Sequence, residues 1–94
     1  MNAQAHLYLL EESIVDWFDD ELDDAEIEDW LHSSRQAAAD VGNRKIARAI
    51  DAAIIAADRL TAAWAGEIER TKEITEGFAS ALADLQKILE STLY

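Results

Sequence analysis

Apolar side chains recur every three or four residues in successive stretches of this 94-residue chain, and proline is absent. That spacing places the apolar residues of each stretch on one face of an α-helix, and proline is the residue that most strongly interrupts helices. Glycine occurs only three times, whereas alanine, leucine, isoleucine, aspartate and glutamate dominate, which favours helix nearly everywhere. The pattern therefore predicts an all-α fold, with residues 1–94 forming a single domain.

The first helix is predicted over residues 3–20, with an apolar face formed by Leu7, Leu10, Ile14, Trp17 and Phe18. Asp23 is a typical N-cap for a second helix, and Glu26 three residues later fits a capping box. The predicted core face of the second helix consists of Ile27, Trp30, Leu31, Ser34, Ala38 and Val41. Gly42 is the expected stop, because glycine readily adopts the left-handed conformation in which many helices end.

Two further apolar stripes follow Asn43, which can cap the helix after it. The first stripe consists of Ile46, Ile50, Ala53, Ala57, Leu60 and Trp64, and the second of Ile74, Phe78, Leu82, Leu85 and Leu89. Between them, residues 65–73 carry one large apolar side chain, Ile68. A break at Gly66 gives a small four-helix bundle, which we favour. An uninterrupted helix over 44–92 would be roughly 70 Å long, which is too long for the first two helices to cover. A three-helix chain of that kind would therefore have to form a homodimer.

The net charge of −12 is distributed very unevenly along the chain. Residues 1–34 contain eleven acidic residues and no lysine or arginine, whereas residues 35–94 contain the other nine acidic residues and all eight basic ones. The acidic N-terminal third therefore carries −11 and the near-neutral C-terminal helices carry −1. Binding to phosphates requires a basic face, so the sequence argues against direct binding to nucleic acid.

Metal-binding motifs fail on inspection. Cysteine is absent, which excludes disulfides, thiolate metal sites and cysteine nucleophiles. An EF-hand loop that started at Asp19 would need glycine at its sixth position and glutamate at its twelfth. This chain has Asp24 and Trp30 at those positions. Asp29 and His32 have the spacing of a di-iron ligand pair, but they lie away from the core face of their helix. We interpret His32 as a solvent-exposed neighbour of Glu28, one turn earlier.

Enzymatic chemistry is not indicated either. Ser33 and Ser34 adjoin His32, but consecutive residues of a helix point in different directions, and there is no glycine-rich phosphate loop. The sequence therefore predicts a protein that is not an enzyme, with no catalytic residue, no cofactor and no metal site. Apolar runs of only a few residues predict neither a signal peptide nor a membrane span, and hence a cytoplasmic location.

The acidic residues of the N-terminal third are the candidate binding site. A protein surface normally mixes both signs of charge, because a cluster of one sign repels itself. A basic surface on a partner protein would relieve that repulsion and be steered towards the cluster. On one helix, Glu12, Asp16 and Asp20 would form a row of carboxylates roughly 5–6 Å apart, near the spacing of phosphates along a nucleic-acid strand. The predicted partner-binding residues are Glu12, Asp16, Asp19, Asp20, Asp23, Asp24 and Glu28.

The segment DWFDDELDDAEIEDW, residues 16–30, combines this charge with aromatic side chains. In composition and size the chain resembles small acidic phage-encoded inhibitors, such as anti-CRISPR and anti-restriction proteins. Some of those proteins mimic DNA and block a basic nucleic-acid channel. The resemblance implies an inhibitor that binds a basic protein surface of a nucleic-acid-handling complex.

A second resemblance rests on Trp64-Ala65-Gly66. This W-x-G tripeptide is similar to that of the WXG100 family of secreted helical hairpins, where it makes the bend. The resemblance implies a structural or assembly subunit that pairs through its C-terminal helices, and it supports a turn at Gly66. The chain departs from the family pattern in two ways, since the tripeptide lies well past the midpoint and the Tyr-x-x-x-acid signal is missing.

Overall fold

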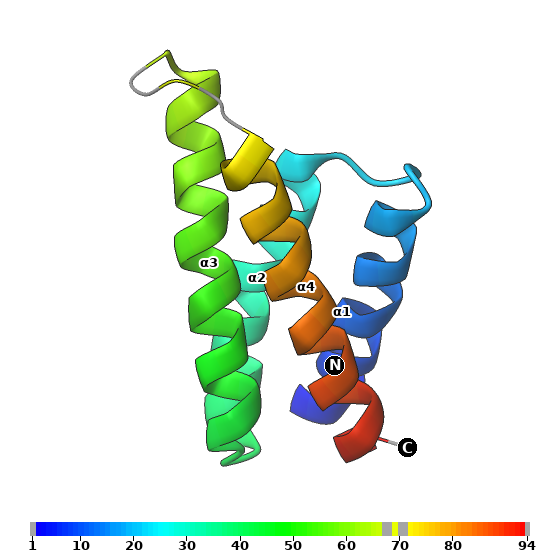
Figure 1. The fold of residues 1–94 in the computed structure, drawn as a ribbon. Helices are drawn as coiled ribbons and strands as arrows, with labels where there is room; N and C mark the ends of the chain where they lie inside the picture. Colours follow the sequence, from blue (N-terminus) through cyan, green and yellow to red (C-terminus); the bar gives the residue numbers. More distant parts are fainter. Residues whose placement is uncertain (1, 67–68, 70–71, 94) are drawn as a thin grey trace.

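The computed structural model describes residues 2–66, 69 and 72–93. Within these residues the chain forms four helices in the order α1 (Ala3–Phe18), α2 (Asp24–Asp40), α3 (Arg44–Trp64) and α4 (Lys72–Leu93). α1 and α3 each pack against both α2 and α4, and successive helices run in opposite directions (Figure 1). The bundle measures 37 × 24 × 21 Å. The predicted all-α four-helix fold is confirmed. None of these helices is at once long and apolar enough to cross a membrane.

Side-chain caps begin the first three helices. In each case a side-chain oxygen accepts a hydrogen bond from the backbone N–H three residues later, at 2.8 Å for Asn2 and Asp23 and at 3.1 Å for Asn43. Such a bond satisfies one of the backbone N–H groups that have no partner within the helix. The caps predicted at Asp23 and Asn43 are therefore confirmed.

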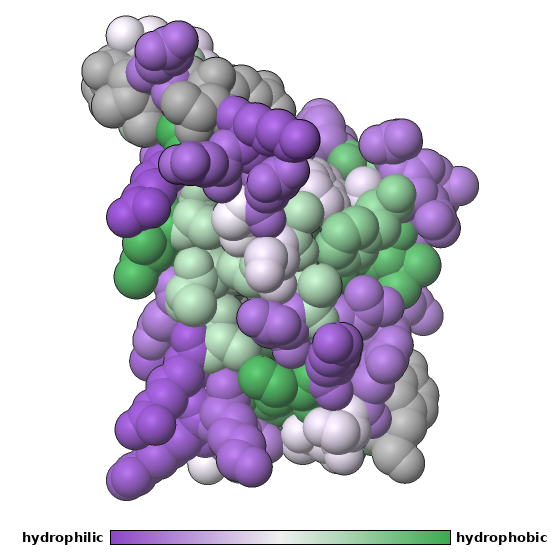
Figure 2. All heavy atoms as spheres, in the orientation of Figure 1, coloured by the Kyte–Doolittle hydropathy of each residue, from purple (hydrophilic) through white to green (hydrophobic). Residues whose placement is uncertain are grey.

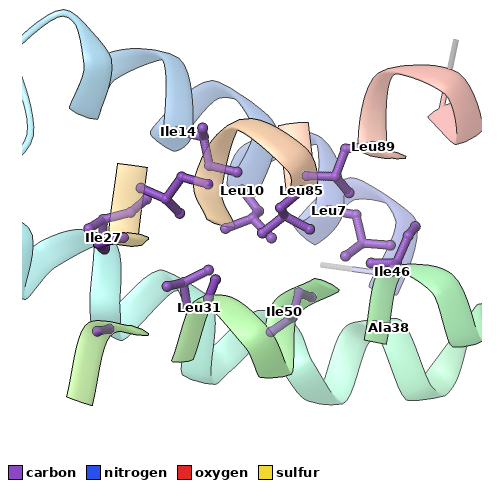
Figure 3. Close-up of a cluster of buried hydrophobic side chains, with 14 of the residues drawn as sticks. Leu7, Leu10, Ile14, Ile27, Leu31, Ala38, Ile46, Ile50, Leu85 and Leu89 are labelled. Atoms are coloured by element: carbon purple, nitrogen blue, oxygen red, sulfur yellow. The ribbon is translucent and has the colours of Figure 1, made fainter. Parts of the chain in front are cut away.

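One hydrophobic core joins the apolar faces of all four helices (Figure 3). Its largest fully buried apolar side chains are Leu7, Leu10, Ile14, Ile27, Leu31, Ile46, Ile50, Phe78, Leu82, Leu85 and Leu89. Burying a side chain of this size contributes roughly 1.5–3 kcal/mol. All of these residues belong to the predicted stripes, so the centre of each stripe is confirmed.

Three residues at the ends of the predicted stripes are exposed instead. Phe18 is 42% exposed, Val41 43% and Trp64 50%. Phe18 and Trp64 are the last residues of α1 and α3, and Val41 caps the C-terminus of α2. Helical spacing predicts the direction of a side chain, whereas its burial also requires a neighbouring helix that extends far enough to cover it. Their assignment to the core was therefore wrong.

Left-handed residues end α1, α2 and α3. Gly42 has a φ of +69°, and the backbone N–H of Asn43 donates to the carbonyl oxygen of Ala38, as in a Schellman motif. The predicted stop at Gly42 is confirmed. Asp20, with a φ of +60°, takes the same place after α1, which ends at Phe18 rather than at the predicted residue 20.

Gly66 follows α3 with a φ of +79°. The predicted break is confirmed, and α3 and α4 are separate helices that pack against each other. The continuous helix over 44–92 is not found, so the fold does not require the homodimer that such a helix would need. Ile68, in the segment between the two stripes, lies outside the described residues.

Replacing Gly66 with alanine is expected to lower the free energy of unfolding by about 1 kcal/mol or more. An added Cβ would meet no atom within 4 Å, so the cost comes from the left-handed backbone alone. Gly77 lies inside α4 with equally open space around an added Cβ, which makes Gly77→Ala the matched control. It should stabilise the fold by up to about 1 kcal/mol. Thermal unfolding measures both variants, and a Gly66→Ala protein at least as stable as the wild type would argue against this turn.

Candidate partner-binding end of the bundle

Acidic side chains gather at one end of the bundle, where the α1–α2 turn lies beside the end of α3 and the start of α4 (Figure 1). We call this region the acidic end and define it by Asp19, Asp20, Glu21, Asp23 and Asp24. The first turns of α4 add exposed Glu73 and Glu76 near it, and Lys72 pairs with Glu76 at 3.6 Å. Carboxylates from both halves of the sequence therefore contribute to one negative surface.

Basic side chains gather at the opposite end of the bundle, where exposed Asp40 also ends α2. Arg44, Lys45 and Arg48 are exposed in the first turns of α3, next to the α2–α3 turn. Figure 2 shows hydrophilic side chains at both ends of the visible face and an apolar stretch between them, over α3 and α4. The acidic cluster of the α1–α2 turn and this basic cluster thus lie at opposite ends of the bundle. The division of the sequence at residue 34 does not reveal this, because residues 35–94 supply charges to both ends.

An open groove of about 780 Å³ lies at the acidic end. Exposed Phe18 and Trp64 line it together with Trp17, and Thr75 and Ala79 of α4 also line it. Its acidic rim consists of Asp20, Glu21, Asp23, Asp24 and Glu26. The structure therefore brings together two features that the sequence placed on opposite faces, the acidic residues and the aromatic residues. We call this feature the acidic groove.

Trp17 connects the acidic groove to the core. Its indole Nε1–H donates a hydrogen bond to Oδ1 of Asp24 at 2.6 Å. Its ring meets the rings of Phe18 and buried Phe78 edge to face, with centroids 5.1 Å apart in both pairs. Such aromatic pairs contribute about 0.5–1.5 kcal/mol beyond the area that they bury. One side of the groove is therefore held in a fixed geometry.

Several predicted binding residues also have structural roles at this end. Asp23 caps α2, Asp24 holds Trp17, and Asp20 occupies the left-handed position after α1. Asp19 and Glu21 are exposed, and their side chains make no hydrogen bond or ion pair within the described part of the chain. Both carboxylates are therefore available to a partner.

The acidic residues after α1 oppose its helix dipole. The last turn of α1 contains no basic residue, and Asp16, Asp19 and Glu21 lie in or just after it. A helix C-terminus carries a partial negative charge, so a nearby carboxylate is unfavourable by about 0.3–1 kcal/mol and a cation favourable by a similar amount. The α1 dipole by itself would favour neutral or basic residues at these positions.

Two of the predicted positions lie elsewhere than expected. The predicted row is kept only by Glu12 and Asp16, one turn apart on α1, and it is wrong for Asp20, because α1 ends at Phe18 and Asp20 leaves the helix. Glu28 is half-buried against α3, where the Thr61 hydroxyl donates to its Oε2 at 2.7 Å. Its Oε1 lies 3.7 Å from Nε2 of His32, which agrees with the predicted Glu28–His32 proximity.

Glu11 is a buried carboxyl that the sequence did not distinguish from the other acidic residues. Only 9% of its surface is exposed, and it directly follows the core residue Leu10. Burial raises the pKa of Glu11 above its ordinary value, and the negative charges of Glu90 and Glu12 raise this pKa further. Glu11 lies four residues after Leu7 and three before Ile14, which places it on the apolar face of α1, and α4 packs beside that helix.

Glu11→Gln is expected to raise the thermal midpoint at neutral pH. Because its pKa is raised on folding, the folded state holds this proton more tightly than the unfolded state. Stability therefore falls as the pH rises from the ordinary carboxyl pKa through the raised one, and ionised Glu11 destabilises the fold above that window. The advantage of the variant should shrink as the pH falls to about 4. Exposed Glu12→Gln is the control and should give a smaller gain; equal gains would contradict the burial effect.

Comparison of the chain with protein families and curated proteins, and of its structure with solved structures, finds no match.

Proposed function

We propose that this chain is a non-enzymatic cytoplasmic binding protein whose acidic end docks on a basic surface of a partner protein. In this proposal the partner belongs to a nucleic-acid-binding machine, such as a CRISPR or restriction complex, and docking inhibits it. The observation that carries the proposal is the acidic groove, which acidic residues line together with exposed Phe18 and Trp64.

This combination of groups suits an arginine-rich surface. Carboxylates accept paired hydrogen bonds from guanidinium groups, and the faces of aromatic rings attract the same cations. Tryptophan and arginine are among the residues most often responsible for binding energy at interfaces. The unbalanced negative charge would also speed association with a basic partner. Trp64, Phe18 and the rim carboxylates can therefore serve one contact.

The placement of charge supports a binding role over a purely solubilising one. Charge improves solubility wherever it lies on the surface, so solubility does not require acidic residues at any one position. Asp19 and Glu21 lie where the α1 dipole disfavours a carboxylate. Retaining unfavourable charges at one site is typical of positions whose function opposes stability.

Inhibition would follow from competition for one surface. A basic channel binds nucleic acid largely through phosphates, and carboxylates at the acidic end would occupy the same cationic side chains. The predicted DNA mimicry is part of this proposal. It now rests on the clustered carboxylates of the acidic end instead of a straight row along α1.

Competitive capture from the native host tests this function. The immobilised protein should retain a basic protein, and added double-stranded DNA should release that protein. The purified partner should in turn lose DNA binding when this chain is present. A captured partner that DNA fails to displace, and whose DNA binding is unaffected, would refute the inhibitory role.

The second candidate is an assembly subunit that pairs through α3 and α4. One observation favours it, since Ile55 is 60% exposed and lines an open groove between these helices, over which Figure 2 shows an apolar stretch. The chain is a four-helix bundle and not the single hairpin of WXG100 proteins, although its W-x-G tripeptide does lie at a turn. Light scattering distinguishes the candidates: a tight dimer that Ile55→Asp dissociates would favour the assembly role.

A further inference from the structure

Three metal-ligating side chains meet on the α2–α3 face. Glu28 and His32 are one turn apart on α2, and Asp58 reaches them from α3. Their nearest ligand atoms all lie within 4.8 Å of one another, and Glu28 Oε1 and His32 Nε2 are 3.7 Å apart. We propose that these residues bind a divalent transition-metal ion of the zinc class. This site is independent of the acidic groove and of the proposed function.

The distances suit such an ion. Zinc binds imidazole nitrogen and carboxylate oxygen at about 2.0–2.2 Å, which places tetrahedral ligands roughly 3.4 Å apart. The Glu28–His32 pair is already close to that separation. His32 and Asp58 are exposed, so both side chains can adjust by about an ångström without disturbing the core. Three protein ligands would leave a fourth position for water.

Glu28 is held in place by a residue outside the ligand set. Its Oε2 accepts a hydrogen bond from the Thr61 hydroxyl at 2.7 Å, which leaves Oε1 directed towards His32. Hydrogen bonds that orient a metal ligand in this way are typical of metal sites. Glu28 is also half-buried, so its carboxylate has fewer positions available than one in open solvent. Thr61 is therefore a positioning residue in this proposal.

The charges at this site favour the binding of a cation. Two carboxylates face each other across the α2–α3 contact, and neither pairs with a lysine or arginine in the part of the chain that the structure describes. Elsewhere on the same contact, Arg35 and Asp51 form an ordinary ion pair at 2.7 Å. A divalent ion would neutralise Glu28 and Asp58 together, and the imidazole favours zinc, copper or nickel over magnesium or calcium.

Calorimetric titration of the intact protein with zinc chloride tests the site. We expect saturable binding of one ion per chain, with magnesium and calcium far weaker. His32→Ala and Asp58→Asn should each weaken zinc binding by about tenfold or more, and Thr61→Val by about tenfold. Zinc should also raise the thermal midpoint of the wild type, because it binds only the folded chain, and should leave that of His32→Ala nearly unchanged.

Two controls separate this site from loose binding by other groups. His6→Asn removes the other histidine, and Asp19→Asn with Glu21→Asn weakens the acidic end. Both proteins should bind zinc as the wild type does. The site would be disproved by unchanged affinity in His32→Ala and Asp58→Asn, or by the absence of saturable zinc binding in the wild type. The variants alter exposed side chains, so loss of binding would not reflect unfolding, and circular dichroism checks this.

Discussion

Phe78→Ala is expected to lower the free energy of unfolding by about 3–5 kcal/mol. Phe78 is 1% exposed and lies where the core meets the acidic groove, with the Trp17 ring packed edge to face against it. Alanine would leave a cavity under Trp17 and remove this ring contact. Since a domain of this size has a total stability of only about 5–15 kcal/mol, the variant should be close to unfolding. Chemical denaturation monitored by circular dichroism measures the loss.

Phe18→Ala is the matched control, because Phe18 belongs to the same aromatic cluster but is largely open to solvent. It should cost about 1 kcal/mol or less, since it loses one edge-to-face contact and little burial. In the proposed function this change should still weaken partner binding. If the two substitutions destabilised the fold equally, the division of this cluster into core and surface would be wrong.

Asp19→Lys combined with Glu21→Lys is expected to increase stability and to weaken partner binding. Lysine after the last turn of α1 would interact favourably with the helix dipole, so each change should stabilise by about 0.3–1 kcal/mol. The same changes place two cations against the basic surface of the partner, which should weaken binding by at least about tenfold. Thermal unfolding and the dissociation constant for the captured partner are the two measurements.

The control for this pair is Asp40→Lys with Asp84→Lys. Both residues are exposed and lie outside the acidic end, and either pair of changes alters the net charge from −12 to −8, that is −12 plus 4. Asp40 also ends α2, so lysine there suits a helix dipole as well. The control should gain stability and keep its partner. Asp23 and Asp24 are unsuitable for this test, because the cap and the Trp17 hydrogen bond would be lost together with the charge.

Most of the fold could be predicted because it depends on local spacing. The apolar stripes, the caps at Asp23 and Asn43, and the stops at Gly42 and Gly66 each involve residues within one or two turns. The end of α1 was harder to predict, since Asp20 fills a position that glycine usually occupies. Aspartate adopts the left-handed conformation more readily than most residues, but its presence alone does not indicate it.

The candidate site was only partly predictable, because it joins distant residues. Acidic residues in the α1–α2 turn follow from the sequence, but their position beside Trp64 depends on the lengths of α1 and α3. The approach of Asp58 to Glu28 and His32 likewise depends on how α2 and α3 pack. Considering His32 only with the neighbours on its own helix could not have found that cluster.

The central claim is that the acidic end makes first contact with a basic partner, and the association rate constant tests it most directly. Stopped-flow or surface-plasmon measurements would compare the wild type with the Asp19→Lys, Glu21→Lys pair and the Asp40→Lys, Asp84→Lys pair as ionic strength rises from about 0.01 M to about 0.15 M. We predict fast, strongly salt-dependent association for the wild type and the control, and slow association with little salt dependence for the acidic-end variant. Equal association rates and equal salt dependence for all three proteins would contradict the claim.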